Sequence, residues 1–235
     1  MKNTCALMGC VVGLFSVAAV GAPQSLLKDA FERSEADDKL EQVGNGWGTN
    51  SQKRAKGVKQ ANLKDGALHI KRAAVADHGV SVTHEVAFRD AEIRLRFKFD
   101  DAKDRLGINI ADMNEKSVHA GHICMAKFGT TELEISDLKT GKMNLASRRA
   151  REKGPLRKEE AQRLKIKSKK FRHETAVGEW HTVLVKIQGE TMTVAIDGEA
   201  VGSFASEGIG HPTKSRLRLA VDRQVWVDDV EVVGE

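Results

Sequence analysis

The stretch AEIRLRFKF, residues 91–99, alternates strictly between apolar and charged side chains. Successive side chains of a β-strand point to opposite faces of a sheet, so this pattern predicts a strand with one buried and one wet face. An Asp197-Gly198 pair between two similar runs is typical of a two-residue hairpin turn. The same period recurs along most of the chain, and we expect further strands at 67–72, 80–86, 106–113, 122–128, 181–187, 216–221 and 225–233. Short strands at this spacing predict an all-β antiparallel sandwich or barrel.

One basic segment departs from the period of two. Residues 148–172 carry twelve Lys or Arg and three Glu, although the formal net charge of the whole chain is only +5. Pro155 suits the first position of a helix, glutamates follow it, and basic residues dominate the end of the segment, an order that suits the helix dipole. We therefore expect one short helix at 155–165 inside a basic insertion of about 146–175.

The insertion has two interpretations. Arg148–Arg172 is a candidate surface for an acidic polysaccharide; the alternative is a solvated loop or lid. Aromatic residues that stack on bases are not interleaved with its lysines, so we expect no nucleic-acid partner.

The first 22 residues have the features of a secretory signal peptide. Lys2 supplies a positive start, an apolar run follows, and small residues precede Pro23. The pattern predicts cleavage after Gly21 or Ala22, a mature single domain at 23–235, and a secreted or periplasmic protein; a lipid anchor or a retained anchor is the alternative. No later segment approaches the ~18 apolar residues of a membrane helix, so we expect none in the mature chain.

The stretch TELEISDLKTG, residues 131–141, carries three carboxylates at Glu132, Glu134 and Asp137. On a regular strand the two glutamates share one face, and Asp137 joins them only if a bulge follows Ile135. Two neighbouring carboxyl groups can act as acid and base in glycoside hydrolysis, because their repulsion raises the pKa of one of them. The alternative is an ordinary strand that keeps its charges in water.

Several motifs resemble those of a known family. ELEISDLKTG is similar to the Glu-x-Gln-Ile-x-Asp strand of the 3-keto-disaccharide hydrolase domain family, and GEWHTVLVKIQGETMTVAIDGEAVGSF to its Gly-Glu-Trp strand and the hairpin that follows. RLRLAV and VWVDDVEV resemble its closing strands, and the likeness covers most of 29–233. The resemblance implies a concanavalin-like two-sheet jelly roll that hydrolyses a glycosidic or modified-sugar bond. It makes Glu132 and Glu134 an acid/base pair helped by Asp137, although the family usually has Gln at position 134.

Few aromatic residues are present to stack on a sugar ring. The chain has no Tyr and only three Trp. Trp180 and Trp226 stand in strand contexts and are expected in the core, which leaves Trp47, in a Gly-rich loop, as the stacking candidate. Arg94 and Arg96, on the wet face of the 91–99 strand, are the candidate polar contacts to the sugar.

Two groups of side chains raise the question of a metal. His122 and Cys124 would share a strand face and could ligate zinc or copper, but no second cluster accompanies them, so we assign no metal there. Calcium is a further hypothesis for the acidic stretch that contains Asp37, Asp38 and Glu41, which lacks the spacing of a defined calcium loop. We assign no cofactor.

Two functional hypotheses of different classes remain. The first is a secreted carbohydrate-active hydrolase. The second is a non-catalytic binding module for an acidic polysaccharide or a cell-envelope glycan.

Overall fold

The computed structural model describes residues 23–234, so the expected signal peptide lies outside the described residues. Two antiparallel sheets form the body of the molecule. Among the described residues, no helix is long and apolar enough to cross a membrane.

Sheet A and sheet B each follow a continuous order of hydrogen-bonded strands. Sheet A runs β13 (Glu199–Ala205), β12 (Thr191–Ile196), β11 (His181–Gln188), β6 (Ala91–Lys98), β15 (Gln224–Gly234), β4 (Ala67–Lys71) and β3 (Ala61–Lys64), with β1 (Gln24–Asp29) also paired to β15. Sheet B runs β10 (Ser168–Arg172), β9 (Glu132–Asp137), β8 (His122–Phe128), β7 (Leu106–Ala111), β14 (Lys214–Val221), β5 (Val80–Phe88) and β2 (Gly48–Thr49). The helical elements are α1 (Ser51–Arg54), the 3-10 turn η1 (His119–Gly121), α2 (Leu145–Glu152) and α3 (Lys158–Lys165).

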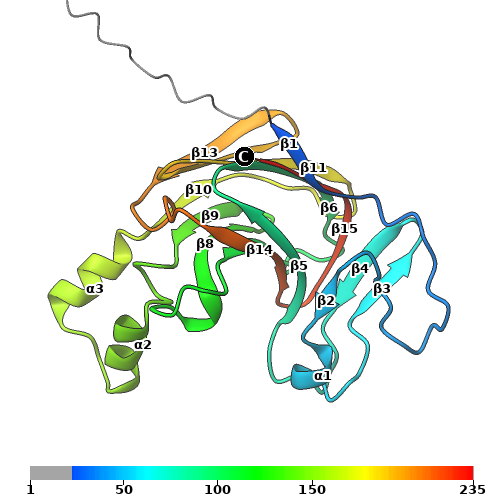
Figure 1. Ribbon diagram of the computed structural model, residues 1–235, viewed down its shortest axis with the longest axis horizontal. Helices are drawn as coiled ribbons and strands as arrows, with labels where there is room; N and C mark the ends of the chain where they lie inside the picture. The colour runs from blue at the N-terminus through cyan, green and yellow to red at the C-terminus, as the bar shows by residue number, and fades with distance from the viewer. Residues whose placement is uncertain (1–22, 235) are drawn as a thin grey trace, which may run out of the picture.

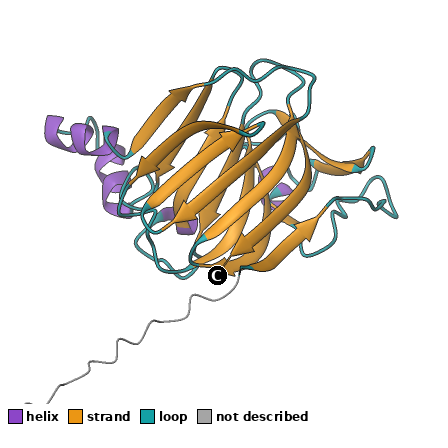
Figure 2. Cartoon of the chain, turned by 90° about the horizontal axis from the view of Figure 1, so that it is seen from above, coloured by secondary structure: helices purple, strands orange, loops and turns teal. Residues whose placement is uncertain are grey.

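The stacked sheets are curved into an arch. Figure 1 shows sheet A on the convex side and sheet B lining the hollow, with α2 and α3 beside one end of the hollow and α1 beside the other. Seen from above, no helix covers the strands of the convex sheet, and α2 and α3 lie beyond one edge of that sheet (Figure 2). The hollow face of sheet B and the convex face of sheet A are therefore the two large surfaces on which strand side chains can meet a ligand.

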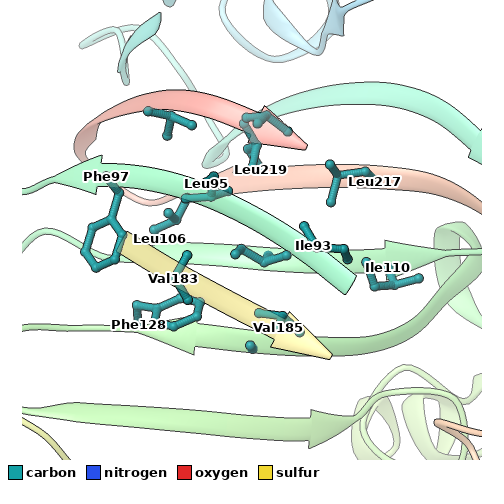
Figure 3. Close-up of a cluster of buried hydrophobic side chains, with 14 of the residues drawn as sticks. Ile93, Leu95, Phe97, Leu106, Ile110, Phe128, Val183, Val185, Leu217 and Leu219 are labelled. Atoms are coloured by element: carbon teal, nitrogen blue, oxygen red, sulfur yellow. The ribbon is translucent and has the colours of Figure 1, made fainter. Parts of the chain in front are cut away.

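The core between the sheets is built from the alternating apolar residues. Ile93, Leu95 and Phe97 of β6 are buried, as the pattern of residues 91–99 predicts. Figure 3 shows them with Val183 and Val185 of β11, opposite side chains from β7, β8 and β14 of sheet B. The rings of Phe97 and Phe128 lie 5.7 Å apart and join the two sheets. Burial of this layer is the main stabilising contribution to the fold.

The jelly-roll fold and most of the expected strands are confirmed. The hairpin between β12 and β13 turns at Asp197 and Gly198, which have φ angles of 51° and 82°. Positive φ at both central residues is what a two-residue type I′ turn requires.

The basic insertion differs from the prediction of a single helix at 155–165. It holds two helices, and α3 begins only at Lys158, after Pro155. The missed helix, α2, follows Asn144, whose side-chain oxygen accepts hydrogen bonds from the backbone N–H groups of Ala146 (3.0 Å) and Ser147 (3.4 Å). That is an N-cap, and Asn is among the residues that favour one. The insertion ends in a strand, β10, which extends sheet B beside β9.

Trp47 is buried, contrary to the expectation of an exposed stacking ring. Only 8% of the residue is exposed. Its indole N–H donates to Asp29 Oδ2 (2.8 Å), and its ring lies 5.7 Å from that of Phe31. Asp29 also accepts from Arg33, Asn45 and the Phe31 backbone N–H. Burial alone would raise the pKa of Asp29, but these hydrogen bonds outweigh it and lower the pKa to about 2 from an ordinary 3.8.

This lowered pKa predicts a loss of stability in acid. A carboxyl group whose pKa is lower in the folded state stabilises the protein above its unfolded-state pKa, and that stabilisation disappears as pH falls from about 4 towards 2. Urea unfolding of the wild type and of Asp29→Asn, which cannot titrate, should show the wild type's advantage shrinking by about 2 kcal/mol between pH 6 and pH 2. A difference that is constant across this range would contradict the assignment.

Candidate functional site

On the hollow face of sheet B, residues of neighbouring strands line up in rows that cross the sheet. Neighbouring rows are defined by the strand register, and the apolar residues between them point into the core. The central row crosses the whole sheet through Gly48, Thr83, Arg218, Asn109, Met125, Ser136 and Ser168. The next row runs through Ser81, Ala220, Gly107, Lys127, Glu134 and Lys170.

The carboxylates of β9 divide between two faces. The register of β9 with β8 is continuous from Leu133 to Asp137, so the bulge that would turn Asp137 towards the glutamates is not formed. Glu132 and Glu134 lie on the hollow face, whereas Asp137 is only 1% exposed. The structure therefore brings the two glutamates together and separates Asp137 from them.

Asp137 instead holds two loops against the end of β9. Its carboxylate accepts from the Thr140 backbone N–H (2.9 Å), the Ser206 hydroxyl (2.6 Å) and the Gly208 backbone N–H (3.1 Å). Lys167 Nζ lies 3.8 Å from the same carboxylate. Because its carboxylate accepts all of these hydrogen bonds, Asp137 fixes the end of β9 and the loop between β13 and β14.

Both glutamates stand beside lysines. Glu132 accepts from Lys170 Nζ at 2.8 Å, and 44% of its side chain is exposed. Glu134 has Lys127 and Lys170 as its partners in the strand register, and Ser136 Oγ donates to its Oε1 at 3.1 Å. Ser136 thus restrains the orientation of the Glu134 carboxylate.

A buried arginine, Arg218, lies at the centre of the hollow face and contacts neutral groups. The sequence pattern did not indicate this residue. Arg218 is 8% exposed. Its Nη1 lies 3.2 Å from Asn109 Oδ1 and 3.1 Å from His122 Nε2, and its Nη2 donates to the Ala120 carbonyl at 3.3 Å. His122 Nδ1 is 3.0 Å from Asn109 Oδ1. Arg218 Nη1 also lies 3.0 Å from His122 Nδ1, so a neutral imidazole presents an unprotonated ring nitrogen to the guanidinium in either tautomer.

Positive charge dominates the surroundings of Arg218. Burial first, and then the charges of Arg218, His119, Arg148 and Lys142, lower the pKa of His122 to about 3. Burial, Arg148 and Arg218, followed by His78 and Arg54, lower the pKa of His119 as well. These groups come from both ends of the hollow, since Arg54 belongs to α1 and Arg148 to α2 (Figure 1).

A pocket adjoins this region at α2. It has a volume of about 290 Å³ and is lined by Lys142, Met143, Arg148, Arg151 and Glu152. Part of the basic insertion therefore lies beside the hollow face, where its charge can act on a ligand held there.

A second polar network supports the end of β7. Asp112 Oδ2 accepts from His211 Nε2 (3.0 Å) and from Thr213 Oγ1 (2.6 Å). Lys139 Nζ lies 2.9 Å from His211 Nδ1. Burial would raise the pKa of Asp112, but the hydrogen bonds from Thr213, Asn114 and His211 lower it to about 2. The network connects the β13–β14 loop to the end of β7, and most of its polar atoms form hydrogen bonds with one another.

Arg94 and Arg96 lie on the convex face of sheet A, away from the β9 glutamates. Arg96 is ion-paired with Asp228 and with Asp229 (2.8 Å). Its guanidinium also lies 5.0 Å from the ring centroid of Trp180. Trp180, expected in the core, is 37% exposed, and Lys98 lies between its ring and that of Trp226. The predicted sugar contacts Trp47, Arg94 and Arg96 thus do not share a surface with Glu132 and Glu134.

The metal hypotheses find no assembled site. A register shift between β7 and β8 places Cys124 in the core while His122 faces the hollow. Burial raises the pKa of the Cys124 thiol to about 12. Glu41 is bound to the backbone N–H groups of Gln60 and Ala61. Within residues 23–234, no three His, Cys, Asp or Glu side chains gather as metal ligands, and this includes Asp37, Asp38 and Glu41.

The two roles seen for the β9 carboxylates predict different effects on stability. Asp137→Ala should lower the free energy of unfolding by about 3 kcal/mol, because it leaves several buried donors without an acceptor. The matched variant Glu132→Ala should lose less than about 1 kcal/mol, since it removes an exposed ion pair. Urea denaturation of both variants measures these losses, and equal losses would contradict the distinction.

Several solved structures are similar to this chain. The laminarinase from Rhodothermus marinus is 11% identical and covers 90% of this chain and 98% of its own, with a TM-score of 0.58. The laminarinase from Flavobacterium sp. UMI-01 is 13% identical, covers 90% and 100%, and has a TM-score of 0.55. A carbohydrate-binding module from Bacillus subtilis is 8% identical, covers 79% and 93%, and has a TM-score of 0.50. At these identities the likeness is one of fold.

The family assignment comes from the sequence. No sequence among the curated proteins is significantly similar to this chain. Residues 37–233 match the model of the 3-keto-disaccharide hydrolase family, which is described as a 3-keto-alpha-glucoside-1,2-lyase-like domain. This match confirms the family that the strand motifs indicated. The chain belongs to the 3-keto-alpha-glucoside-1,2-lyase-like domain family.

Proposed function

We propose that the chain is a secreted carbohydrate-active enzyme that cleaves a glycosidic or modified-sugar bond on the hollow face of sheet B. The observation that carries this proposal is the position of Glu132 and Glu134, which share that face on a regular strand. The family and the fold shared with two laminarinases and a carbohydrate-binding module support a sugar as the ligand.

The two glutamates are suited to different tasks. Cleavage of a glycosidic bond, by water or by elimination, needs one group to accept a proton and another to protonate the leaving oxygen. Glu132 is ion-paired with Lys170, which favours it as the base. Glu134, oriented by the Ser136 hydroxyl, is the second proton-transfer group. Residues two apart on a strand face are roughly 6.5–7 Å apart at the backbone, and a carboxyl separation of about 6.5–9.5 Å leaves room for a water molecule between them.

Non-catalytic binding of an acidic polysaccharide is the second candidate function. It is favoured by the basic pocket at α2, where Lys142, Arg148 and Arg151 gather beside the hollow face. In this function Arg148–Arg172 would hold the polysaccharide, and the glutamates would be neutralised by lysines as an ordinary strand surface.

Turnover distinguishes the two functions. The purified domain should release product from a panel of disaccharides, 3-keto-disaccharides and polysaccharides. Glu134→Gln should lower the rate by roughly 10²–10⁴-fold, as expected when a carboxyl group that transfers a proton is lost. Glu231→Gln, which removes a carboxylate from the convex sheet, is the matched control and should leave the rate unchanged.

Product analysis separates hydrolysis from elimination, because elimination leaves a carbon–carbon double bond in the sugar. A folded wild type that retains acidic polysaccharide but cleaves nothing in the panel would favour the binding function. A rate that Glu134→Gln leaves intact would contradict the catalytic role of this residue.

Secretion is tested separately from activity. The residues before Pro23 predict export and removal of the leader. The full chain, expressed in a bacterium and recovered outside the cytoplasm, should begin at Ala22 or Pro23 when its N-terminus is read by mass spectrometry. Recovery of the chain in the cytoplasm with Met1 retained would contradict secretion.

A further inference from the structure

We propose that Arg218 is the anchor of an oxyanion subsite on the hollow face, and that the ligand it takes is the carboxylate of an acidic sugar. The inference rests on the proposed function, since it assumes that this face holds a carbohydrate. It goes beyond that function by assigning a binding site at β14, β7 and β8, outside both the β9 glutamates and the basic insertion.

The first step is the unbalanced charge of Arg218. Among the described residues no carboxylate oxygen lies within ion-pair distance of its guanidinium, whose hydrogen bonds go to Asn109, His122 and Ala120. Each of these groups is a neutral acceptor. A buried charge is costly unless it is paired as well as hydrogen-bonded. The cost is visible in the pKa of Arg218, which burial and then the charge of Arg216 lower to about 10, although the more distant carboxylate of Glu85 raises it in part.

The second step is the contrast with Arg216, two residues earlier on the same face of the same strand. Arg216 Nε donates to Glu85 Oε1 at 2.6 Å, so its charge is neutralised within the sheet. Arg218 is more deeply buried than Arg216 and lacks such a partner among the described residues. The chain therefore pairs the more exposed arginine and leaves the buried one available to an external anion.

The third step is the field around the site. The charges with the largest effects on His119 and His122 are all cationic and all lower the pKa values of these rings. Arg148 and Lys142 from the α2 side and Arg54 from α1 thus add to the attraction of an anion towards Arg218. Gly107 and Ala220 stand in the adjacent row. Because both residues are small, they leave space for a ligand beside Arg218.

The fourth step is the shape of the donor. The Nε of Arg218 and the second hydrogen of Nη2 donate to no acceptor within residues 23–234. Arginine presents its N–H groups as a planar fork that matches the two oxygens of a carboxylate. A sulfate ester offers oxygens to the same donors, so the chemistry shared by both ligands is an oxyanion on a sugar; the planar fork favours the carboxylate.

The test uses glucuronate, a monosaccharide that carries the anion whatever linkage the native glycan has. The methyl ester of glucuronic acid is its neutral counterpart, and glucose 6-sulfate is the second anion. NMR titration of the wild type should show saturable shifts of the Arg218 Nε–H and the His122 ring with glucuronate, and none with the ester. Tighter binding of the sulfated sugar would assign the subsite to sulfate esters and overturn the choice of carboxylate.

Three variants connect the signal to the site. Asn109→Asp places a carboxylate beside Arg218 without removing the arginine, so it should keep the fold and weaken glucuronate binding by roughly tenfold or more, the loss of a hydrogen bond to a charged group. Arg218→Gln should do the same if it folds, as its thermal unfolding will show. Arg216→Gln, which removes an arginine already paired, should bind as the wild type does.

Two results would overturn the inference. One is the absence of a saturable shift at Arg218 with either anion, and the other is binding that Asn109→Asp leaves unchanged. Failure of the proposed function has a different signature. Glucuronate bound at Arg218 with no sugar cleaved would support the subsite and count against catalysis, whereas cleavage of a neutral sugar without glucuronate binding would do the reverse.

Discussion

The apolar layer shared by the two sheets is the constraint on which the rest of the structure depends. Because Ile93, Leu95 and Phe97 of β6 must meet the inward side chains of sheet B, every strand has one face left for chemistry. Curvature makes the two free faces unequal, and the hollow of sheet B is the one flanked by helices (Figure 1). A change of register by one residue would exchange core and site residues together.

On the hollow face, charges are balanced in one region and unbalanced in another. Glu132 and Glu134 stand among lysines, and Asp137 on the other side of the same strand is engaged by loop donors. Arg218, three strands away in the register, is held by neutral acceptors and surrounded by other cations. A sugar lying across the rows would meet both regions, with its bond near the glutamates and an acidic substituent near the arginine. The convex face has a different character, because Arg96 and Lys98 already contact tryptophan rings there.

The sequence predicts the features that depend on neighbouring residues and misses those that depend on distant ones. Alternation locates the strands, and the Asp197-Gly198 pair locates a hairpin. The glutamates' shared face follows from the same period. Trp47 looks exposed in its Gly-rich loop, but its N–H meets Asp29 eighteen residues earlier, a contact that no local pattern indicates. Helix α2 had a signal in Asn144, a favoured N-cap residue. The proposed subsite at Arg218 could not be read from RLRLAV, since its distinguishing feature is that the hydrogen-bond partners of Arg218 within residues 23–234, which come from β7, β8 and η1, include no carboxylate.

The central claim is that ligands bind the hollow face of sheet B rather than the convex face of sheet A. Hydrogen–deuterium exchange of the domain, with and without the sugar from the panel that binds it most tightly, tests this claim directly. The account predicts slower exchange in η1, β8, β9 and β14, with β6, β11 and β15 unchanged. Slower exchange confined to the segments around Arg96, Trp180 and Trp226 would contradict it and move the binding surface to the convex sheet.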